Sequence, residues 1–500
     1  MSGRVSAAGA QARSRTAALR ARLSEDSRAM LGRRVGRIGL FFAVTLALLA
    51  GLAVAAAAYG FLRWITPVDT AKAAAEIDVT RVALTVVAGV GGVVALVIAY
   101  RRQRDLEQSR FVERFGAAAA QLGATDVAIR IAGVYAMAGV ADESDGLRRQ
   151  QCVDVLCGYL RLPYHPEHGA SHESKLVLKH HRATADGTRA DDEERHLEYR
   201  QNDREVRSTI VRVIVDRLRP SAVYSWSTND YDLRGAHLQN VDFSGVTFSR
   251  TARFDGAIFS GDADFSDATF SDKATFCGST FTSTAGFGKA TFTGDADFSD
   301  ATFGGHAGFG SVTFTRTGWF RSTTFSDMAW FNDATFSGNT GFSDATFAST
   351  GWFGSATFAR TAWFKSATFA RTTWFGDATF AIDADFSKTT FSGDAAFGGA
   401  NFSGDAAFRN STITGEAVFR SATFVGDTDF NGADFSGDAD FNHADFSGSA
   451  AFRGATFSDS AEFRGATFND KAWFGETIFA GDNRRRRIRR CDLHRRRVVP

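Results

Sequence analysis

The chain has 500 residues, and its 57 Lys and Arg nearly balance its 56 Asp and Glu. Only four residues are cysteine, which excludes a dense disulfide framework and predicts reduced thiols. The sequence contains no nucleophile elbow, phosphate-binding loop, zinc-protease motif or dinucleotide fingerprint, so we expect no enzyme, no cofactor and no metal site.

Residues 1–37 form a basic N-terminal segment with nine arginines against two acidic residues. Two segments without any charged residue follow, 38–61 and 82–100, joined by a short loop, 62–81. At 1.5 Å per residue, a helix of either segment is long enough to cross a hydrocarbon core about 30 Å thick. The sequence therefore predicts two transmembrane helices and an external loop, with a buried core helix and a cleaved signal peptide as the alternatives.

Arginines lie at the outer ends of both apolar segments, whereas the connecting loop is short and holds Asp69, Lys72, Glu76 and Asp78. Cytoplasmic loops carry an excess of Lys and Arg, which predicts that both termini and everything after residue 100 lie in the cytoplasm. Arginine far outnumbers lysine, as is typical of GC-rich coding, so we expect a bacterial inner (plasma) membrane protein.

The sequence between the membrane segments and the repeats predicts a small helical region over 101–162 and a polar linker over 163–202. Helices are expected near 106–122, 126–141 and 147–159. Residues 203–231 begin with a further helix, up to residue 218, that carries one apolar face. We expect it to cap the open edge of the first coil of the repeats.

Phenylalanine recurs with a strict alternation of five and six residues from Phe243 to Phe479. The pattern marks 44 positions, and Ile413 is the only one that is not phenylalanine. A small residue, usually alanine, stands two positions before each phenylalanine, so both side chains point to the same side of an extended chain. This fixed period predicts a repeat architecture and excludes an α-helix with its 3.6-residue stripe.

The stretch "DLRGAHLQNVDFSGVTF" (232–248) resembles the pentapeptide-repeat family, whose units approximate to A-(D/N)-(L/F)-x-x. The resemblance implies a right-handed, quadrilateral parallel β-helix over 232–482. This sequence departs from the family pattern after Phe248, where every second unit gains a residue, so four sides take 22 residues per coil and the region holds about eleven coils. The absence of proline from 232 to 482 fits continuous strand pairing. The sequence leaves the geometry of the six-residue corners open.

Three tryptophans, Trp330, Trp352 and Trp374, follow one another at intervals of 22 residues. In the predicted fold they lie one above another in three consecutive coils, at the position before the phenylalanine. The side chains either face solvent or turn into the corner and pack there. In the first case they form an apolar patch and hence a candidate partner-binding stripe.

Residues 483–500 form a tail with nine arginines against one acidic residue. Arg484, Arg485, Arg486 and Arg487 are candidates for contact with an anionic membrane surface. A solvated tail and a tail folded back onto the acidic repeats are the alternatives. At the end of the rod, covering by the tail and pairing with a second chain both remain open.

Together these features predict a membrane-anchored, non-catalytic scaffold or protein-interaction module. Expected partners are the lipid bilayer, a protein that the sequence does not identify, and a second copy of the chain as an alternative. The resemblance implies a rival function, because some pentapeptide-repeat proteins are acidic β-helices that mimic DNA and bind topoisomerase. Residues 232–482 hold 30 acidic against 16 basic residues, but the carboxylates are dispersed. Direct nucleic-acid binding is not expected.

Overall fold

The computed structural model describes residues 74–164, 175–180, 193–198, 203–480 and 498–499, with Pro166 and a few positions between 49 and 64. The chain divides into two compact units, Met1–Val112 and Glu113–Pro500. The second unit holds the repeats. The basic segment 1–37 lies outside the described residues.

Helix α3 (Ala74–Leu122) contains the whole of the second apolar segment, 82–100. The first apolar segment, 38–61, lies almost entirely outside the described residues. Among the residues that the structure describes, no helix combines the length and the apolarity that crossing a membrane requires. The two predicted transmembrane helices are therefore not found there, and membrane attachment rests on the sequence alone.

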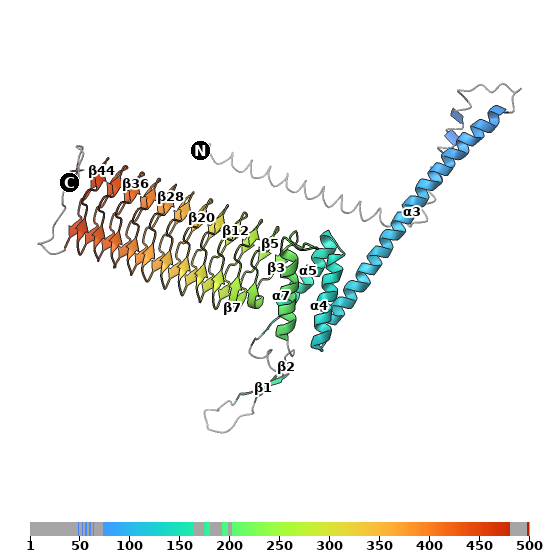
Figure 1. The fold of residues 1–500 in the computed structure, drawn as a ribbon, viewed down its shortest axis with the longest axis horizontal. Helices are drawn as coiled ribbons and strands as arrows, with labels where there is room; N and C mark the ends of the chain where they lie inside the picture. Colours follow the sequence, from blue (N-terminus) through green and yellow to red (C-terminus); the bar gives the residue numbers. More distant parts are fainter. Residues whose placement is uncertain are drawn as a thin grey trace, which may run out of the picture. The chain divides into compact units, whose positions relative to one another are not determined.

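Helices α4 (Val127–Asp142), α5 (Gly146–Leu160) and α7 (Asp203–Leu218) follow α3 in the described residues, close to three of the ranges predicted from the sequence. The helix expected near 106–122 is the last part of α3. Helix α4 begins after Asp126, whose carboxylate accepts hydrogen bonds from two backbone N–H groups of the first turn. The three helices pack on one another, and α5 and α7 contact the first strands of the repeats (Figure 1). The predicted cap of the first coil therefore contains α5 as well as α7.

A buried charged cluster joins these helices. Arg130 is fully buried and donates to Asp203 Oδ1 at 2.7 Å and to the Tyr159 hydroxyl at 3.0 Å. Arg207 Nε donates to the other Asp203 oxygen at 2.8 Å. Burial, and then the hydrogen bond to Asp203, raise the pKa of Tyr159, so its neutral hydroxyl donates to the carboxylate. Removing one partner would leave a buried charge without compensation, so the cluster fixes how α4, α5 and α7 meet.

The segment 163–202, predicted to be a polar linker, contains two strands that the sequence did not predict. Strands β1 (Lys175–His180) and β2 (Glu193–Glu198) pair antiparallel within it, with Lys175 opposite Glu198. The stretch contains few apolar residues, so its composition gave no strand signal. The hairpin lies between α5 and α7 in the chain and forms no sheet with the repeats.

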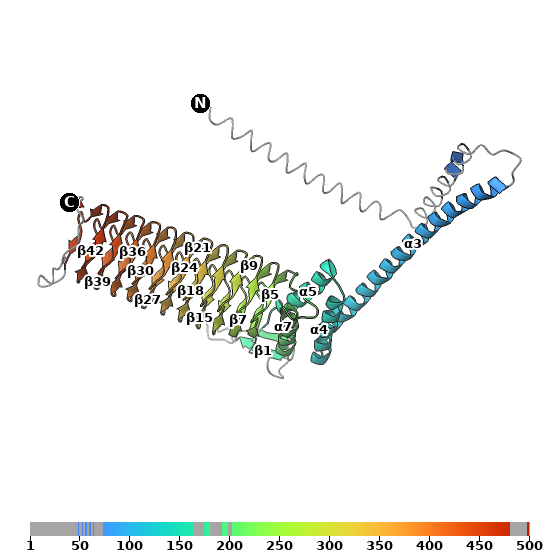
Figure 2. The same cartoon turned by 45° about the horizontal axis from the view of Figure 1, so that its top comes forward.

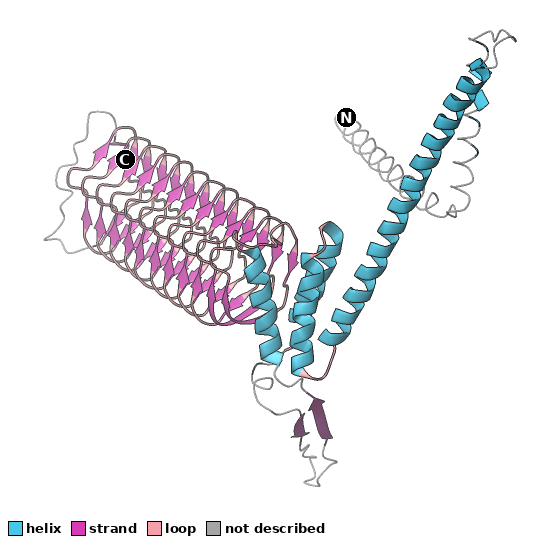
Figure 3. Cartoon of the chain, turned by 45° about the vertical axis from the view of Figure 1, so that its right-hand side comes forward, coloured by secondary structure: helices cyan, strands magenta, loops and turns pink. Residues whose placement is uncertain are grey.

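The repeats fold into the predicted four-sided parallel β-helix (Figure 3). Each strand pairs in parallel with its equivalent in the next coil, as Thr280 pairs with Thr302. The four strands of one coil are β10 (Thr280–Phe281), β11 (Ala285–Gly286), β12 (Thr291–Phe292) and β13 (Ala296–Asp297). We name the four sides of the rod after these strands, so the β11 and β13 sides are opposite each other.

Each side is a stack of strands in register (Figure 2). In the first coils, β4 (His237–Asp242) and β7 (Ile258–Asp264) run through both the β10 and the β11 side, and the other strands of the rod span two residues. The β12 side contains 11 strands, from β5 (Thr247–Phe248) to β44 (Thr467–Phe468), which confirms about eleven coils. Its outward threonines stack in register.

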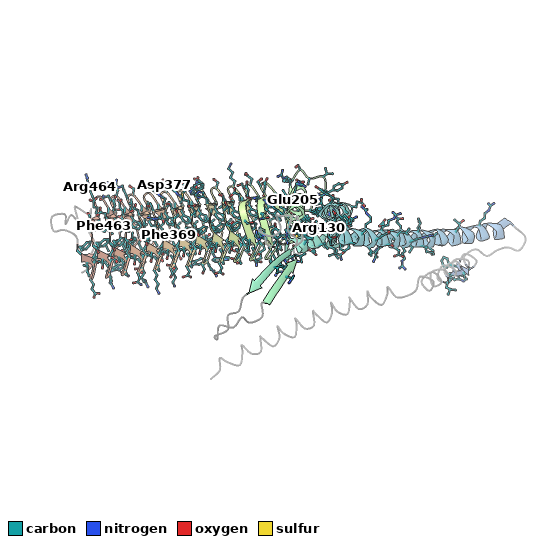
Figure 4. The ribbon with its side chains drawn as sticks, turned by 90° about the horizontal axis from the view of Figure 1, so that it is seen from below. Arg130, Glu205, Phe369, Asp377, Phe463 and Arg464 are labelled. Carbon is teal, nitrogen blue, oxygen red and sulfur yellow. The ribbon has the colours of Figure 1, made fainter. Side chains whose placement is uncertain are left out.

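The core of the rod consists of stacked phenylalanine rings. Figure 4 shows Phe369 and Phe463 pointing inward and Asp377 and Arg464 pointing outward. Rings at equivalent positions of successive coils lie parallel, as for Phe276 and Phe298, whose centroids are 4.7 Å apart. Rings from opposite sides meet edge to face, and buried alanines fill the space between them. Each such aromatic pair contributes about 0.5–1.5 kcal/mol beyond burial, so the regular sequence gives a regular core.

The two kinds of corner differ in backbone geometry, which answers the question that the sequence left open. At the five-residue step after Phe375, the Ala378 N–H donates to the Phe375 carbonyl at 3.1 Å, and Asp377 has a φ of 57°. Asp tolerates this left-handed conformation better than most residues. At the six-residue steps the backbone forms its hydrogen bonds with the next coil instead. The coils lie close together there, because a Cβ on Gly294 would be 2.3 Å from the backbone of Asp272.

Aspartates at the six-residue corners brace one coil against the next. The Asp383 carboxylate accepts from the Asp405 N–H at 3.2 Å, and the Asp405 carboxylate accepts from the Asp427 N–H at 2.9 Å. In the "GDADF" stretches, Asp262 and Asp438 make equivalent contacts. The structure gives them a hydrogen-bonding role along the rod, which explains the acidic composition of the repeats in part.

The C-terminal end of the rod is covered on one side by the chain itself. The β13 side runs from β3 (Tyr231–Asp232) to β45 (Ala472–Trp473), and β47 (Val498–Val499) then pairs in parallel with β45. The β10 side ends at β46 (Ile478–Phe479). Of the two alternatives for this end, the structure favours covering by the tail.

Candidate protein-docking surface

The three tryptophans singled out in the sequence form one column on the β11 side. Trp330 of β19 (Ala329–Trp330), Trp352 of β23 (Gly351–Trp352) and Trp374 of β27 (Thr373–Trp374) stand in register in successive coils. They are 41%, 36% and 42% exposed, whereas the phenylalanine after each is fully buried. The side chains alternate across the strand, so of the two alternatives left by the sequence the structure has the indoles on the solvent side, each partly exposed. We call this column the tryptophan stripe.

The stripe is a partly stacked aromatic array. The ring centroids of Trp352 and Trp374 are 5.4 Å apart with an interplanar angle of 6°. His306, from the coil before, stacks on Trp330 at 5.8 Å. The spacing of about 4.8 Å between coils is close to an aromatic stacking distance, so identical outward positions bring the indoles together. The next residue of the column is Ala396, which has no ring to continue the stack.

Small residues and carboxylates border the stripe. Two positions after the tryptophans stand Asn332, Gly354 and Gly376, which leave the indoles uncovered from that direction. On the other border, Asp394 accepts a hydrogen bond from the Thr372 hydroxyl at 3.4 Å, and exposed Glu416 and Asp438 follow in the next coils. The stripe is therefore an apolar surface that adjoins three carboxylates at its Trp374 end, with the exposed Arg371 on the same border.

Three more tryptophans stand at the same outward position on the β13 side, but they are less exposed: Trp319, Trp363 and Trp473. Trp319 extends over Gly341 and stacks on Trp363 with centroids 5.9 Å apart. Arg321 lies over the Trp319 ring at 3.9 Å, and Arg453 over the Trp473 ring at 5.6 Å. These cation–π contacts cover indoles that would otherwise face solvent.

Neither an ionised thiol nor a metal-binding cluster is found among the described residues. Burial raises the pKa of Cys152 to about 11, and that of Cys157 and Cys277 to about 12, so these thiols do not ionise at neutral pH. Within the same residues, no group of three or more His, Cys, Asp or Glu side chains comes close enough together to hold a metal ion. A groove of about 430 Å³ beside β3 is lined by polar residues, and several of its side chains already pair, as Arg250 does with Asp230.

Comparison with known protein families gives a match in the repeat region. The family described as pentapeptide repeats (9 copies) matches residues 228–269, 265–313, 353–400, 397–445 and 441–484. The repeat region belongs to the pentapeptide-repeat family. No curated protein and no solved structure matches the chain.

The pentapeptide-repeat match leaves out 314–352, and this gap contains Trp319, Trp330 and Trp352. The family pattern has Asp or Asn at the position that tryptophan occupies here. The solenoid is nevertheless regular through the gap, because every phenylalanine in it is buried. The chain thus departs from the family on its surface and keeps the core of the family.

Two features of this pentapeptide-repeat surface were not anticipated. The cations over the β13-side indoles have a signal in the sequence, since Arg321 follows Trp319 by two residues and so shares its side of the strand. The acidic border of the stripe needed the register between coils, because Asp394 and Trp374 belong to different coils. The candidate residues Arg484, Arg485, Arg486 and Arg487 lie outside the described residues.

Proposed function

We propose that the chain is a non-catalytic scaffold whose pentapeptide-repeat rod docks another protein through the tryptophan stripe. The observation that carries this proposal is the in-register, solvent-facing column of three indoles on a regular parallel sheet. Contiguous exposed aromatic surface of this kind marks contact sites, and tryptophan is among the residues enriched at the centres of interfaces.

The test compares Trp352→Ala with Trp363→Ala, which removes an indole from the opposite side. Cells that produce the full chain are treated with a crosslinker, and crosslinked proteins are identified for each variant and for a chain that lacks 232–482. We expect a defined partner that is lost without the rod, reduced with Trp352→Ala and retained with Trp363→Ala. Equal yields for both tryptophan variants would overturn docking at the stripe.

The scaffold is proposed to be attached to the bacterial inner membrane through 38–61 and 82–100, with the rod and both termini in the cytoplasm. Support comes from the two uncharged segments and from the arginines at their outer ends. Arg484 to Arg487 would add contact with anionic lipid. Extraction of isolated membranes at alkaline pH tests this: a spanning chain stays in the pellet, and release into the supernatant would contradict the anchor.

A DNA mimic that binds topoisomerase or another nucleic-acid-binding protein is the second candidate. One observation favours it: Asp383, Asp405 and Asp427 form a row of carboxylates on successive coils. The row then ends at Ser449, so it is short beside the continuous charge of a duplex. Inhibition of gyrase supercoiling by the purified full chain at micromolar concentration would support this candidate, and no inhibition would count against it.

A further inference from the structure

We infer that the tryptophan stripe binds an arginine-bearing segment of a separate protein, with guanidinium groups stacked on the indoles. This inference rests on the proposed docking function and specifies the chemistry of the partner.

The opposite side of the same rod supplies the template. There, Arg321 lies 3.9 Å above the Trp319 ring and Arg453 lies over Trp473, and Lys365 stands two residues after Trp363. Each of these indoles therefore has a cation at the position two residues after it, either in its own coil or, for Trp473, in the coil before. A guanidinium over an indole face is a favourable and geometrically specific contact in this fold.

The tryptophan stripe has the same indoles without an arginine or lysine two residues after them. At the position equivalent to Arg321 it carries Asn332, Gly354 and Gly376. Among the described residues, the cation–π contacts of the rod involve the β13-side indoles and none of the stripe. The stripe thus presents indoles in a setting where the rod elsewhere places arginine, and that position is open to a group from outside.

Charge complementarity also selects a cationic partner. Asp394, Glu416 and Asp438 are exposed on three successive coils beside and beyond Trp374. Arg420, in the neighbouring column, is already paired with Asp440 at 2.7 Å. The carboxylates steer a basic segment to this end of the stripe, and the planar guanidinium of arginine stacks on indole better than the ammonium of lysine does.

The position of the described flanks of the tail favours a separate protein over the chain's own arginines. Residues 478–479 lie in the last coil on the β10 side, and Val498–Val499 pairs with β45 on the β13 side. Both fixed points are at the end of the rod and on sides other than that of the stripe. A variant that ends at residue 482 tests this choice directly.

The probes are two short fluorescent peptides of equal length, one alternating Gly and Arg and the other alternating Gly and Lys, so both carry the same charge. Their affinities for the purified full chain are measured by fluorescence anisotropy at one ionic strength. We expect the arginine peptide to bind at least about fivefold more tightly, because only arginine adds planar stacking. A ratio near one would overturn the inference and leave the proposed docking function standing.

The decisive variant is Gly376→Arg, which places an internal arginine two residues after Trp374, as Arg321 stands after Trp319. A Cβ at Gly376 would meet only the Gly398 carbonyl, at 3.5 Å, so the side chain fits. We expect the arginine preference to fall toward one. Ser387→Arg adds the same charge in the equivalent column of the β13 side and should keep the preference. Equal loss in both variants would overturn the inference.

Two further variants separate the remaining outcomes. Trp374→Ala should abolish the preference for the arginine peptide, and an unchanged preference would contradict stacking at the stripe. The chain ending at residue 482 should bind like the full chain. A clear gain in affinity on removing the tail would mean that the tail occupies the stripe, which would overturn the assignment to a separate partner.

Discussion

The β11 and β13 sides of the rod each carry three tryptophans at the same outward position, yet only those on the β11 side are well exposed. The strands and the buried phenylalanines beneath them are alike. The difference lies in the neighbouring residues. On the β13 side, Trp319 packs over Gly341 and is covered by the guanidinium of Arg321. On the β11 side, Gly354 and Gly376 have no side chain that could cover the stripe. Exposure of an indole on this solenoid is therefore set by the next residue of its own column and by the adjacent column.

The largest expected effect is the loss of stability when a core phenylalanine is removed, and it should be the same beneath both sides because they share one interior. Phe331→Ala beneath the stripe and Phe320→Ala beneath the β13 side each remove a fully buried ring. Both should lower the free energy of unfolding by about 3–5 kcal/mol, measured by urea denaturation. A loss confined to one side would mean that the sides also differ in their core.

The next effect breaks the packing on the β13 side alone. A Cβ at Gly341 would lie 2.7 Å from the Trp319 ring, so Gly341→Val should displace that indole and cost about 1–3 kcal/mol. Gly308→Val is the matched change on the β11 side, where the nearest atom is a backbone oxygen at 3.8 Å. Its effect should stay within about 0.5 kcal/mol. Comparable losses at the two sites would contradict the described packing.

A smaller effect isolates the cation. Arg321→Ala removes the guanidinium from the Trp319 ring and should cost about 0.5–1 kcal/mol while shifting tryptophan emission to longer wavelength. Asn332→Ala is the equivalent change beside the stripe and should leave both stability and emission unchanged. If the arginine variant also left the emission unchanged, the contact would not shield the indole in solution.

The smallest expected effect is the loss of stability in acid as one carboxylate on the first strand of each side becomes protonated. A hydrogen bond from Arg234 holds the pKa of Asp232, on β3, below its ordinary value of 3.8, and one from the Ser244 hydroxyl does the same for Asp242, on β4. Both carboxylates therefore stabilise the fold above pH 3.8, and this contribution is lost as the pH falls below that value.

The salt dependence of that loss distinguishes the two residues. The contribution of Asp232 depends mainly on Arg234 and Arg161, whereas that of Asp242 depends mainly on Ser244 and less on Arg219, 3.6 Å away. Added salt should therefore weaken the contribution of Asp232 more. Urea midpoints at about pH 6 and about pH 3 for Asp232→Asn and Asp242→Asn, with and without salt, measure both. Equal salt sensitivity of the two variants would contradict this assignment.

Much of the rod could be predicted from the sequence because one spacing determines it. The alternation of five and six residues places every phenylalanine inward, sets the length of each coil and puts Trp330, Trp352 and Trp374 in one column. The corners could not be predicted, because the left-handed conformation of Asp377 and the bond from Asp405 to Asp383 depend on contacts between coils. The same holds for the acidic border of the stripe.

The helical region was predicted in its elements and missed in its chemistry. Apolar periodicity located α4, α5 and α7, but Arg130, Tyr159 and Asp203 lie far apart in the sequence and meet only in the fold. The hairpin of β1 and β2 was missed because its polar residues resemble a linker. Long-range polar contacts leave no periodic signal, whereas repeated apolar contacts do.

The division of each coil into two halves of equal length has a consequence for how such genes change. Loss or duplication of a segment that encodes one whole coil shortens or lengthens the rod and leaves every side with its own residues. Loss of a segment that encodes half a coil also preserves the spacing of phenylalanines, but it moves everything that follows to the opposite side. Selection for a folded core alone would accept both events. Selection for a continuous recognition surface would accept only the first.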